Sequence, residues 1–189
     1  MTDFFAADKT YEKVTSAHPL IKGEYENCKF DNCDLSNADL AGMKFIDCTF
    51  TSCNLSMAKL VKTVFNKVSF KDCKMWGLRL YDCSAFGLSF TFDGCSVNHS
   101  SFYGLKIPKT KFINTQLHEV DFTDCDLASS VFDNCDFTNA NFENTILEKA
   151  DFTTSHNYSI DPMINKLKKA KFALPAVVGL LYKYDIVIE

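Results

Sequence analysis

Nine cysteines and four histidines are the residues of this 189-residue chain that could bind a metal, form disulfides or act as nucleophiles. Zinc sites use close pairs of such residues, for example C-x₂-C or C-x₄-C, gathered around one point. Cys28 and Cys33 have the second spacing, but a step of five recurs along the whole chain and therefore indicates a repeat. We expect neither a metal nor a cofactor.

The histidines stand in no Cys/His or Ser/His arrangement; they are His18, His99, His118 and His156. The chain also has no P-loop, no GxGxxG and no HExxH motif. The sequence therefore predicts no catalytic residues, and we expect a protein that is not an enzyme.

A five-residue repeat defines the elements that must position these side chains. Its apolar centres are Tyr25, Phe30, Leu35, Leu40, Phe45, Phe50, Leu55, Leu60, Phe65, Phe70, Met75 and Leu80, then, after a slip of two residues, Val97, Phe102, Ile107, Phe112, Leu117, Phe122, Leu127, Phe132, Phe137, Phe142, Leu147 and Phe152. A period of five fits neither a helix nor a strand. The position two before each centre is small, and all nine cysteines fall there. Because free cysteine behaves as a small hydrophobe, the cysteines are interpreted as packing residues.

A second period of 20 lies above the first, as in the series Phe30, Phe50 and Phe70. Four fives per turn predict a square coil whose sides are short strands in parallel ladders, with coils about 4.8 Å apart. Adjacent cysteines such as Cys28 and Cys33 would then lie on different sides. Stacked ones such as Cys33 and Cys53 would come within disulfide range through coil geometry alone, and a cytosolic chain favours thiols.

At this point the chain resembles the pentapeptide-repeat family, whose consensus is roughly A(D/N)LXX. Residues 37–40 (Asn-Ala-Asp-Leu), 139–142 (Asn-Ala-Asn-Phe) and 149–152 (Lys-Ala-Asp-Phe) match it closely, and the likeness covers about residues 20–172. The resemblance implies an all-β fold, a right-handed quadrilateral parallel β-helix.

The repeat fails at four places, which divide the chain. We expect residues 1–19 to form an N-terminal cap and residues 20–172 to form the solenoid, because an exposed coil end needs covering. The solenoid has a phase slip near 85–97 and an irregular side near 154–164. Residues 173–189 predict a short helix after Pro175, then a strand.

The C-terminal element must bury an apolar face, either on its own last coil or against a second chain. The residues with this role are Val177, Val178, Leu181, Tyr184, Ile186 and Ile188. The ending Leu-Leu-Tyr-Lys-Tyr-Asp-Ile-Val-Ile resembles the terminal segment of the Qnr-type quinolone-resistance branch, which implies a homodimer through this element.

Four aromatic residues around the slip occupy nominally outward positions: Trp76, Tyr81, Phe86 and Tyr103. Either the local distortion tucks them against the coil wall, or they form a contact patch, since exposed aromatic side chains are enriched at interfaces.

Charge is distributed unevenly along the chain. Residues 113–155 hold nine acidic residues and one basic residue, whereas residues 20–80 hold seven acidic and nine basic residues. The candidate acidic surface is Glu119, Asp121, Asp124, Asp126, Asp133, Asp136, Glu143 and Asp151. Some of these acids are simply consensus residues before a centre; alternatively, a narrow acidic rod presents charge as duplex DNA does and attracts DNA-binding proteins. The sequence places them on several sides of the rod.

Two functions remain open. Resemblance to the Qnr branch implies a DNA mimic that binds DNA gyrase or topoisomerase IV and protects them against fluoroquinolones. The other is a pentapeptide-repeat scaffold that binds a different protein and has no topoisomerase activity. One departure favours the second, because the slip of two residues leaves no room for the long mid-solenoid loop of the Qnr branch.

The overall composition bounds the remaining partners. A net charge of −4 gives no general attraction to nucleic acid or anionic membranes. No apolar run approaches the length that spans a bilayer, and the first residues lack the features of a signal peptide. We expect a cytoplasmic protein with no direct binding to nucleic acid or membrane.

Overall fold

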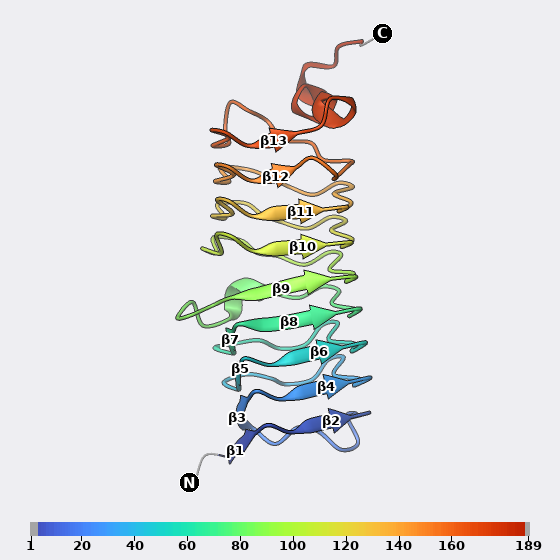
Figure 1. The fold of residues 1–189 in the computed structure, drawn as a ribbon, viewed down its shortest axis with the longest axis vertical. Coiled ribbons are helices and arrows are strands. Elements are labelled where there is room, and N and C mark those ends of the chain that lie inside the picture. The colour runs from blue at the N-terminus through green and yellow to red at the C-terminus, as the bar shows by residue number, and fades with distance from the viewer. Residues whose placement is uncertain (1–3, 188–189) are drawn as a thin grey trace.

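The computed structural model describes residues 4–187, which wind into a rod of stacked coils (Figure 1). The longest ladder is a nine-stranded parallel sheet along one side, which we call face 2. Its strands are β2 (Thr10–Glu12), β4 (Lys29–Asp31), β6 (Thr49–Thr51), β8 (Val68–Lys71), β9 (Phe90–Asp93), β10 (Lys111–Ile113), β11 (Val131–Asp133), β12 (Asp151–Phe152) and β13 (Lys171–Phe172). The all-β parallel solenoid predicted from the spacing of 20 is confirmed.

Face 1 precedes face 2 in each coil and begins as a four-stranded parallel sheet. Its strands are β1 (Phe4–Ala7), β3 (Gly23–Glu26), β5 (Lys44–Ile46) and β7 (Val64–Asn66). In the later coils the same side continues as single parallel bridges that join Lys106, Asp126, Ile146 and Lys166.

The remaining two sides are held by single bridges rather than by strands. Face 3 follows face 2, and its bridged column is Asp34, Asn54, Lys74, Ser96, Gln116, Asp136 and His156. Face 4 closes the coil, with the bridges Asp39 to Lys59 and Arg79 to Ser101, Asp121 and Asn141. The short 3₁₀-helix η1 (Leu80–Asp82) also lies on face 4.

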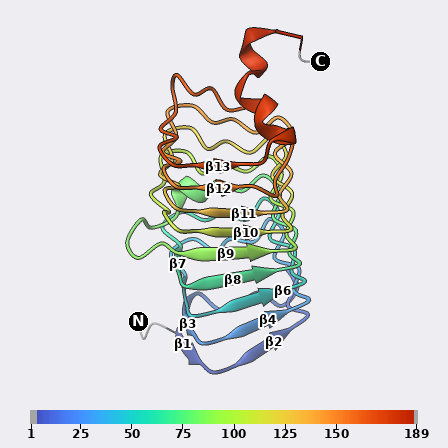
Figure 2. The same ribbon diagram turned by 45° about the horizontal axis from the view of Figure 1, so that its top comes forward.

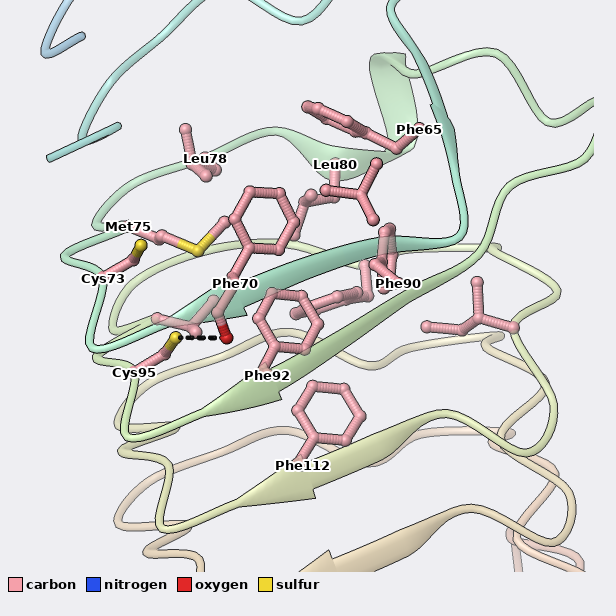
Figure 3. Close-up of a cluster of buried hydrophobic side chains, with 14 of the residues drawn as sticks. Phe65, Phe70, Cys73, Met75, Leu78, Leu80, Phe90, Phe92, Cys95 and Phe112 are labelled. Carbon is pink, nitrogen blue, oxygen red and sulfur yellow. Dashed lines mark hydrogen bonds between the residues drawn. The ribbon is translucent and has the colours of Figure 1, made fainter. Parts of the chain in front are cut away.

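The interior of the rod is filled by the repeat centres. On face 2 they form an unbroken column of stacked aromatic rings: Tyr11, Phe30, Phe50, Phe70, Phe92, Phe112, Phe132, Phe152 and Phe172. Neighbouring ring centroids lie 4.5–5.5 Å apart. Figure 3 shows part of the column, with Phe70, Phe92 and Phe112 one above another. The 18 phenylalanines thus supply a continuous core.

The coil turns a corner two residues after almost every centre, and the corner residue has a positive φ. Asn32 (52°), Asn37 (57°) and Gly42 (74°) show the pattern in one coil. This left-handed conformation is cheapest for glycine, asparagine and aspartate. It explains why the repeat favours these residues outside the core.

The inward position two before each centre holds a hydrogen-bond donor as often as a purely apolar group. Cys95 Sγ donates to the carbonyl oxygen of Phe70 at 3.4 Å (Figure 3), as Ser155 Oγ donates to that of Phe132 at 2.8 Å. The cysteines therefore fill space and also satisfy a backbone carbonyl of the preceding coil, a role that the sequence did not reveal.

The phase slip lies in the loop that leads into β9. Pairing is offset by 20 residues between β6 and β8 (Phe50 with Phe70) and by 22 between β8 and β9 (Phe70 with Phe92). The extra residues form a short loop that projects from the rod (Figure 1), and Phe86 in it is 90% exposed. Near residues 154–164 the predicted irregular side is also present: Tyr158 is buried in place of Asn157.

The N-terminal segment differs from the prediction of a cap over residues 1–19. β1 and β2 pair in parallel with β3 and β4, so residues 4–12 form a coil of the solenoid. The offset here is 19 residues, with Ala6 beside Tyr25 and Tyr11 beside Phe30. One residue fewer, and alanine in place of a large centre, concealed the repeat.

The C-terminal segment also differs from its prediction. The expected helix is two 3₁₀-helices, η2 (Pro175–Leu180) and η3 (Tyr182–Tyr184), which lie over β13 at the end of the rod (Figure 2). The expected strand is absent from residues 185–187, and residues 188–189 lie outside the described residues. Asp185 has φ of 48° and ends η3, and no described strand is available for residues 185–187 to pair with.

One face of η2 caps the last coil. Ala176 and Leu180 pack against the core, and Gly179 accepts a backbone hydrogen bond from Ile160 at 3.0 Å. A Cβ atom at Gly179 would lie 2.1 Å from the carbonyl oxygen of Tyr158, so only glycine permits this contact. Within residues 4–187, no helix has the length and apolar character needed to cross a membrane.

Candidate protein-binding surface

The nine cysteines are all free thiols buried in the rod. Burial raises the pKa of Cys48 to about 11 and the pKa values of Cys83 and Cys135 to about 12. A raised pKa leaves little thiolate, which is the reactive form of cysteine. Among the described residues no group of cysteine, histidine and carboxylate side chains is arranged to hold a metal ion.

We predict that none of the nine thiols reacts with Ellman's reagent at pH 8 while the rod is folded. All nine should react at once in denaturant, because unfolding exposes them and returns their pKa to the usual range. Absorbance at the start of the reaction measures the count. Rapid labelling of even one thiol in the native protein would contradict the packing role.

Three of the four histidines lie on face 3 in successive coils, each near a carboxylate. His99 Nδ1 is 3.2 Å from Glu119 Oε2, and His118 Nε2 is 2.9 Å from Asp136 Oδ2. His156 Nε2 lies 3.7 Å from the same Asp136 oxygen. The sequence gave no sign of this row, because residues 19 to 38 apart do not form a local motif.

Asp136 is the most tightly held carboxylate of the candidate surface. Partial burial raises the pKa of its carboxyl, but hydrogen bonds from Asn157, Thr138 and His118 outweigh that effect and lower the pKa to about 2. This carboxylate therefore stays charged at every pH at which the protein is expected to fold.

The structure divides the eight predicted acidic residues between two pairs of faces. Five lie on faces 3 and 4: Glu119, Asp121, Asp124, Asp136 and Glu143. The other three lie elsewhere, Asp126 on face 1 and Asp133 and Asp151 on face 2. The five, with Asp161, form a surface that we call the acidic band.

The acidic band is uniform in sign. In the later coils, faces 3 and 4 consist of residues 95–104, 115–124, 135–144 and 155–164, which contain six carboxylates and neither lysine nor arginine. With coils about 4.8 Å apart, six charges over four coils give about one per 3 Å along the axis. A single strand of B-DNA carries about one charge per 3.4 Å. Along the rod axis the band thus matches the linear charge density of one DNA strand.

Of the four aromatic residues predicted as a contact patch, the structure brings two together on face 4. The rings of Tyr81 and Tyr103 meet edge to face with centroids 6.4 Å apart, and they are 38% and 50% exposed. They line an open hollow of about 570 Å³ with Asp121 and His99. The aromatic pair therefore adjoins the acidic band.

The other two aromatic residues lie apart from this pair. Trp76 is on face 3, where its indole N–H donates to Ser96 Oγ at 2.7 Å and the Lys74 ammonium lies 3.8 Å from its ring centroid. Phe86 is in the exposed loop before β9.

The predicted C-terminal contact residues are mostly exposed, because η2 uses its other face as the cap. Val178, Leu181, Tyr184 and Ile186 are 38–54% exposed, whereas Val177 is half-buried and Ile188 lies outside the described residues. Leu174, Tyr182 and Val187 extend the same apolar surface and were not predicted.

Comparison with known proteins gives one family and several structures. A family model described as "Pentapeptide repeat region" matches residues 24–91 and 87–152. No curated protein sequence matches the chain.

Solved structures match along almost the whole length. A trypsin-treated form of QnrB1, described as a plasmid-mediated fluoroquinolone resistance protein, is similar with a TM-score of 0.64 and 17% identity, covering 100% of both chains. Full-length QnrB1 gives the same TM-score and identity over 97% of this chain and 100% of its own. HetL, a protein involved in heterocyst differentiation regulation from the cyanobacterium Nostoc sp. strain PCC 7120, has a TM-score of 0.67 and 11% identity over 91% and 85%.

Proposed function

Because the chain belongs to the pentapeptide-repeat family, we propose that it is a non-enzymatic, protein-binding solenoid that mimics DNA and binds DNA gyrase or topoisomerase IV. The observation that carries the proposal is the acidic band, with the linear charge density of one DNA strand on faces 3 and 4. Proteins that grip duplex DNA present basic surfaces, which attract such a band from a distance.

The aromatic pair of Tyr81 and Tyr103 supplies the contact that charge alone does not. Exposed tyrosines near a charged surface are typical of interface hot spots, where they add apolar contact area and a hydrogen-bonding hydroxyl. We propose that this pair selects the partner while the acidic band draws it in. The likeness to QnrB1 supports extending the same role to protection against fluoroquinolones.

A supercoiling assay tests this proposal. Purified protein should inhibit gyrase-catalysed supercoiling at submicromolar to micromolar concentration, and should restore part of the activity in the presence of a fluoroquinolone. The effect should weaken as salt rises, because electrostatic attraction is screened. If supercoiling is unchanged with and without the drug, the topoisomerase proposal fails.

One observation favours the second candidate, a scaffold that binds another protein. The loop before β9 adds only two residues to the coil, and HetL shows a similar fold in a protein with a different described role. A complex with another protein that persists at high salt, together with an inactive supercoiling assay, would establish this alternative.

We further propose that the exposed side of η2 and η3 joins two copies of the chain end to end. A twofold contact buries the same apolar surface on both copies, and it lies at the far end from β1 (Figure 1). Leu181→Glu combined with Val187→Glu should convert a dimer into a 21.4 kDa monomer in light scattering. Phe86→Glu, which charges an exposed apolar residue elsewhere, should leave the mass unchanged. A monomeric unmodified protein at all concentrations would refute the dimer.

A further inference from the structure

The lysines of the later coils gather on one side of the rod. In these coils face 1 consists of residues 105–109, 125–129, 145–149 and 165–169, which contain two carboxylates and six lysines. The six lysines, which we call the lysine face, are Lys106, Lys109, Lys149, Lys166, Lys168 and Lys169. All six are exposed. The net charge of −4 thus averages a basic side with the acidic band beside it.

The lysines are not explained by neighbouring carboxylates. Over residues 4–187, no ion pair includes any of the six, whereas Lys171 on face 2 is paired with Asp151 at 3.0 Å. Backbone hydrogen bonds bring the residues of adjacent coils together, from Leu147 to Lys166 and from Lys149 to Lys168, each at 2.9 Å. Unpaired like charges in adjacent coils repel one another and are favourable only against an anion.

The backbone gives no reason for lysine at the corners of this face either. Lys109, Lys149 and Lys169 have φ of 59–62°, the left-handed conformation in which glycine or asparagine costs less. Corresponding corners on face 2 hold Asn114 and Asn134. The choice of lysine therefore adds charge at a cost in backbone energy.

We propose that the lysine face binds the phosphate backbone of duplex nucleic acid. The charges run along the rod over four coils, and lysine ammonium groups recognise phosphates as point charges without regard to base sequence. An anionic membrane fits less well, because none of the exposed large hydrophobic side chains of residues 4–187 lies on this face of the later coils to insert between lipids. The expectation of no direct nucleic acid binding rested on net charge, which conceals this separation.

Fluorescence anisotropy with a labelled 20-base-pair duplex of random sequence tests the proposal on the full chain. At low salt the unmodified protein should bind, with affinity that falls steeply as salt increases. Lys149→Gln, Lys168→Gln and Lys169→Gln together should lower affinity about tenfold or more and reduce the slope of log K against log salt by about 3, close to 0.9 for each phosphate contact.

The matched control is Lys29→Gln, Lys59→Gln and Lys62→Gln, which removes the same charge from the earlier coils and includes one left-handed corner, Lys62. This control should retain nearly all of the affinity. Equal losses in the two triple variants would overturn the proposal, as would no binding at low salt. Tighter binding of phosphatidylserine vesicles than of the duplex, lost in the same variant, would assign the face to membranes instead. None of these results depends on gyrase, so the proposed function is tested separately.

Discussion

Replacing four carboxylates of the acidic band by amides is expected to lower the affinity for gyrase about a hundredfold. The variant carries Glu119→Gln, Asp121→Asn, Asp124→Asn and Glu143→Gln. Each surface charge contributes on the order of 1 kcal/mol to attraction at contact distance, less when salt screens it. Asparagine retains the side-chain oxygen with which Asp121 accepts the N–H of Thr123, so the turn should survive. Surface plasmon resonance against immobilised gyrase measures the change.

The control for this variant removes the same charge from the same part of the rod. Asp126→Asn, Asp133→Asn, Glu148→Gln and Asp151→Asn lie on faces 1 and 2 and should change affinity by less than about threefold, since distant exposed charges are screened. If both sets weaken binding equally, net charge rather than the acidic band attracts the partner. If neither does, the DNA-mimic account of the surface is wrong.

Phe132→Ala is expected to destabilise the rod by about 3–5 kcal/mol. The ring of Phe132 stacks between Phe112 and Phe152, with centroids 5.1 and 4.6 Å away, and also contacts Phe137. Its removal leaves a cavity that neighbouring coils cannot close without breaking the ladder. Denaturant unfolding, followed by circular dichroism, should show a lower midpoint. Because a solenoid is stabilised mainly between neighbours, the coils beyond Phe132 could melt first, as a separate transition.

Phe86→Ala provides the comparison, because it removes the same side chain from a position that is 90% exposed. Its unfolding midpoint should differ little from that of the unmodified protein. Similar midpoints for Phe86→Ala and Phe132→Ala would show that the aromatic column does not carry the stability assigned to it.

The fold was predictable because identical side chains stack upon one another in a coil of fixed length. The spacing of Phe30, Phe50 and Phe70 contains the ladder of face 2 directly, and the slip of two residues appears as the offset between Phe70 and Phe92. The ends were not predictable in the same way. Ala6 breaks the apolar pattern, and the structure of residues 175–187 depends on the close approach of Gly179 to Tyr158, which no local pattern records.

The surface was only partly predictable. The eight acids were found by counting charges along the chain, but separating Asp121 and Glu143 from Asp126 and Asp133 required the faces. The row of His99, His118 and His156 and the lysine face have the same origin, since both join residues about 20 apart. Periodicity gives each residue a side of the coil, whereas interactions between sides, such as the meeting of Tyr81 with Tyr103, depend on side-chain conformation.

The most direct test of the central claim is competition between this protein and duplex DNA for gyrase. A fluorescent duplex bound to gyrase is titrated with the protein, and its anisotropy is followed at physiological salt. We predict complete displacement of the duplex, and a return of binding when the four carboxylates of faces 3 and 4 are replaced by amides. A duplex that stays bound at saturating protein would contradict the claim that the acidic band occupies the place of DNA.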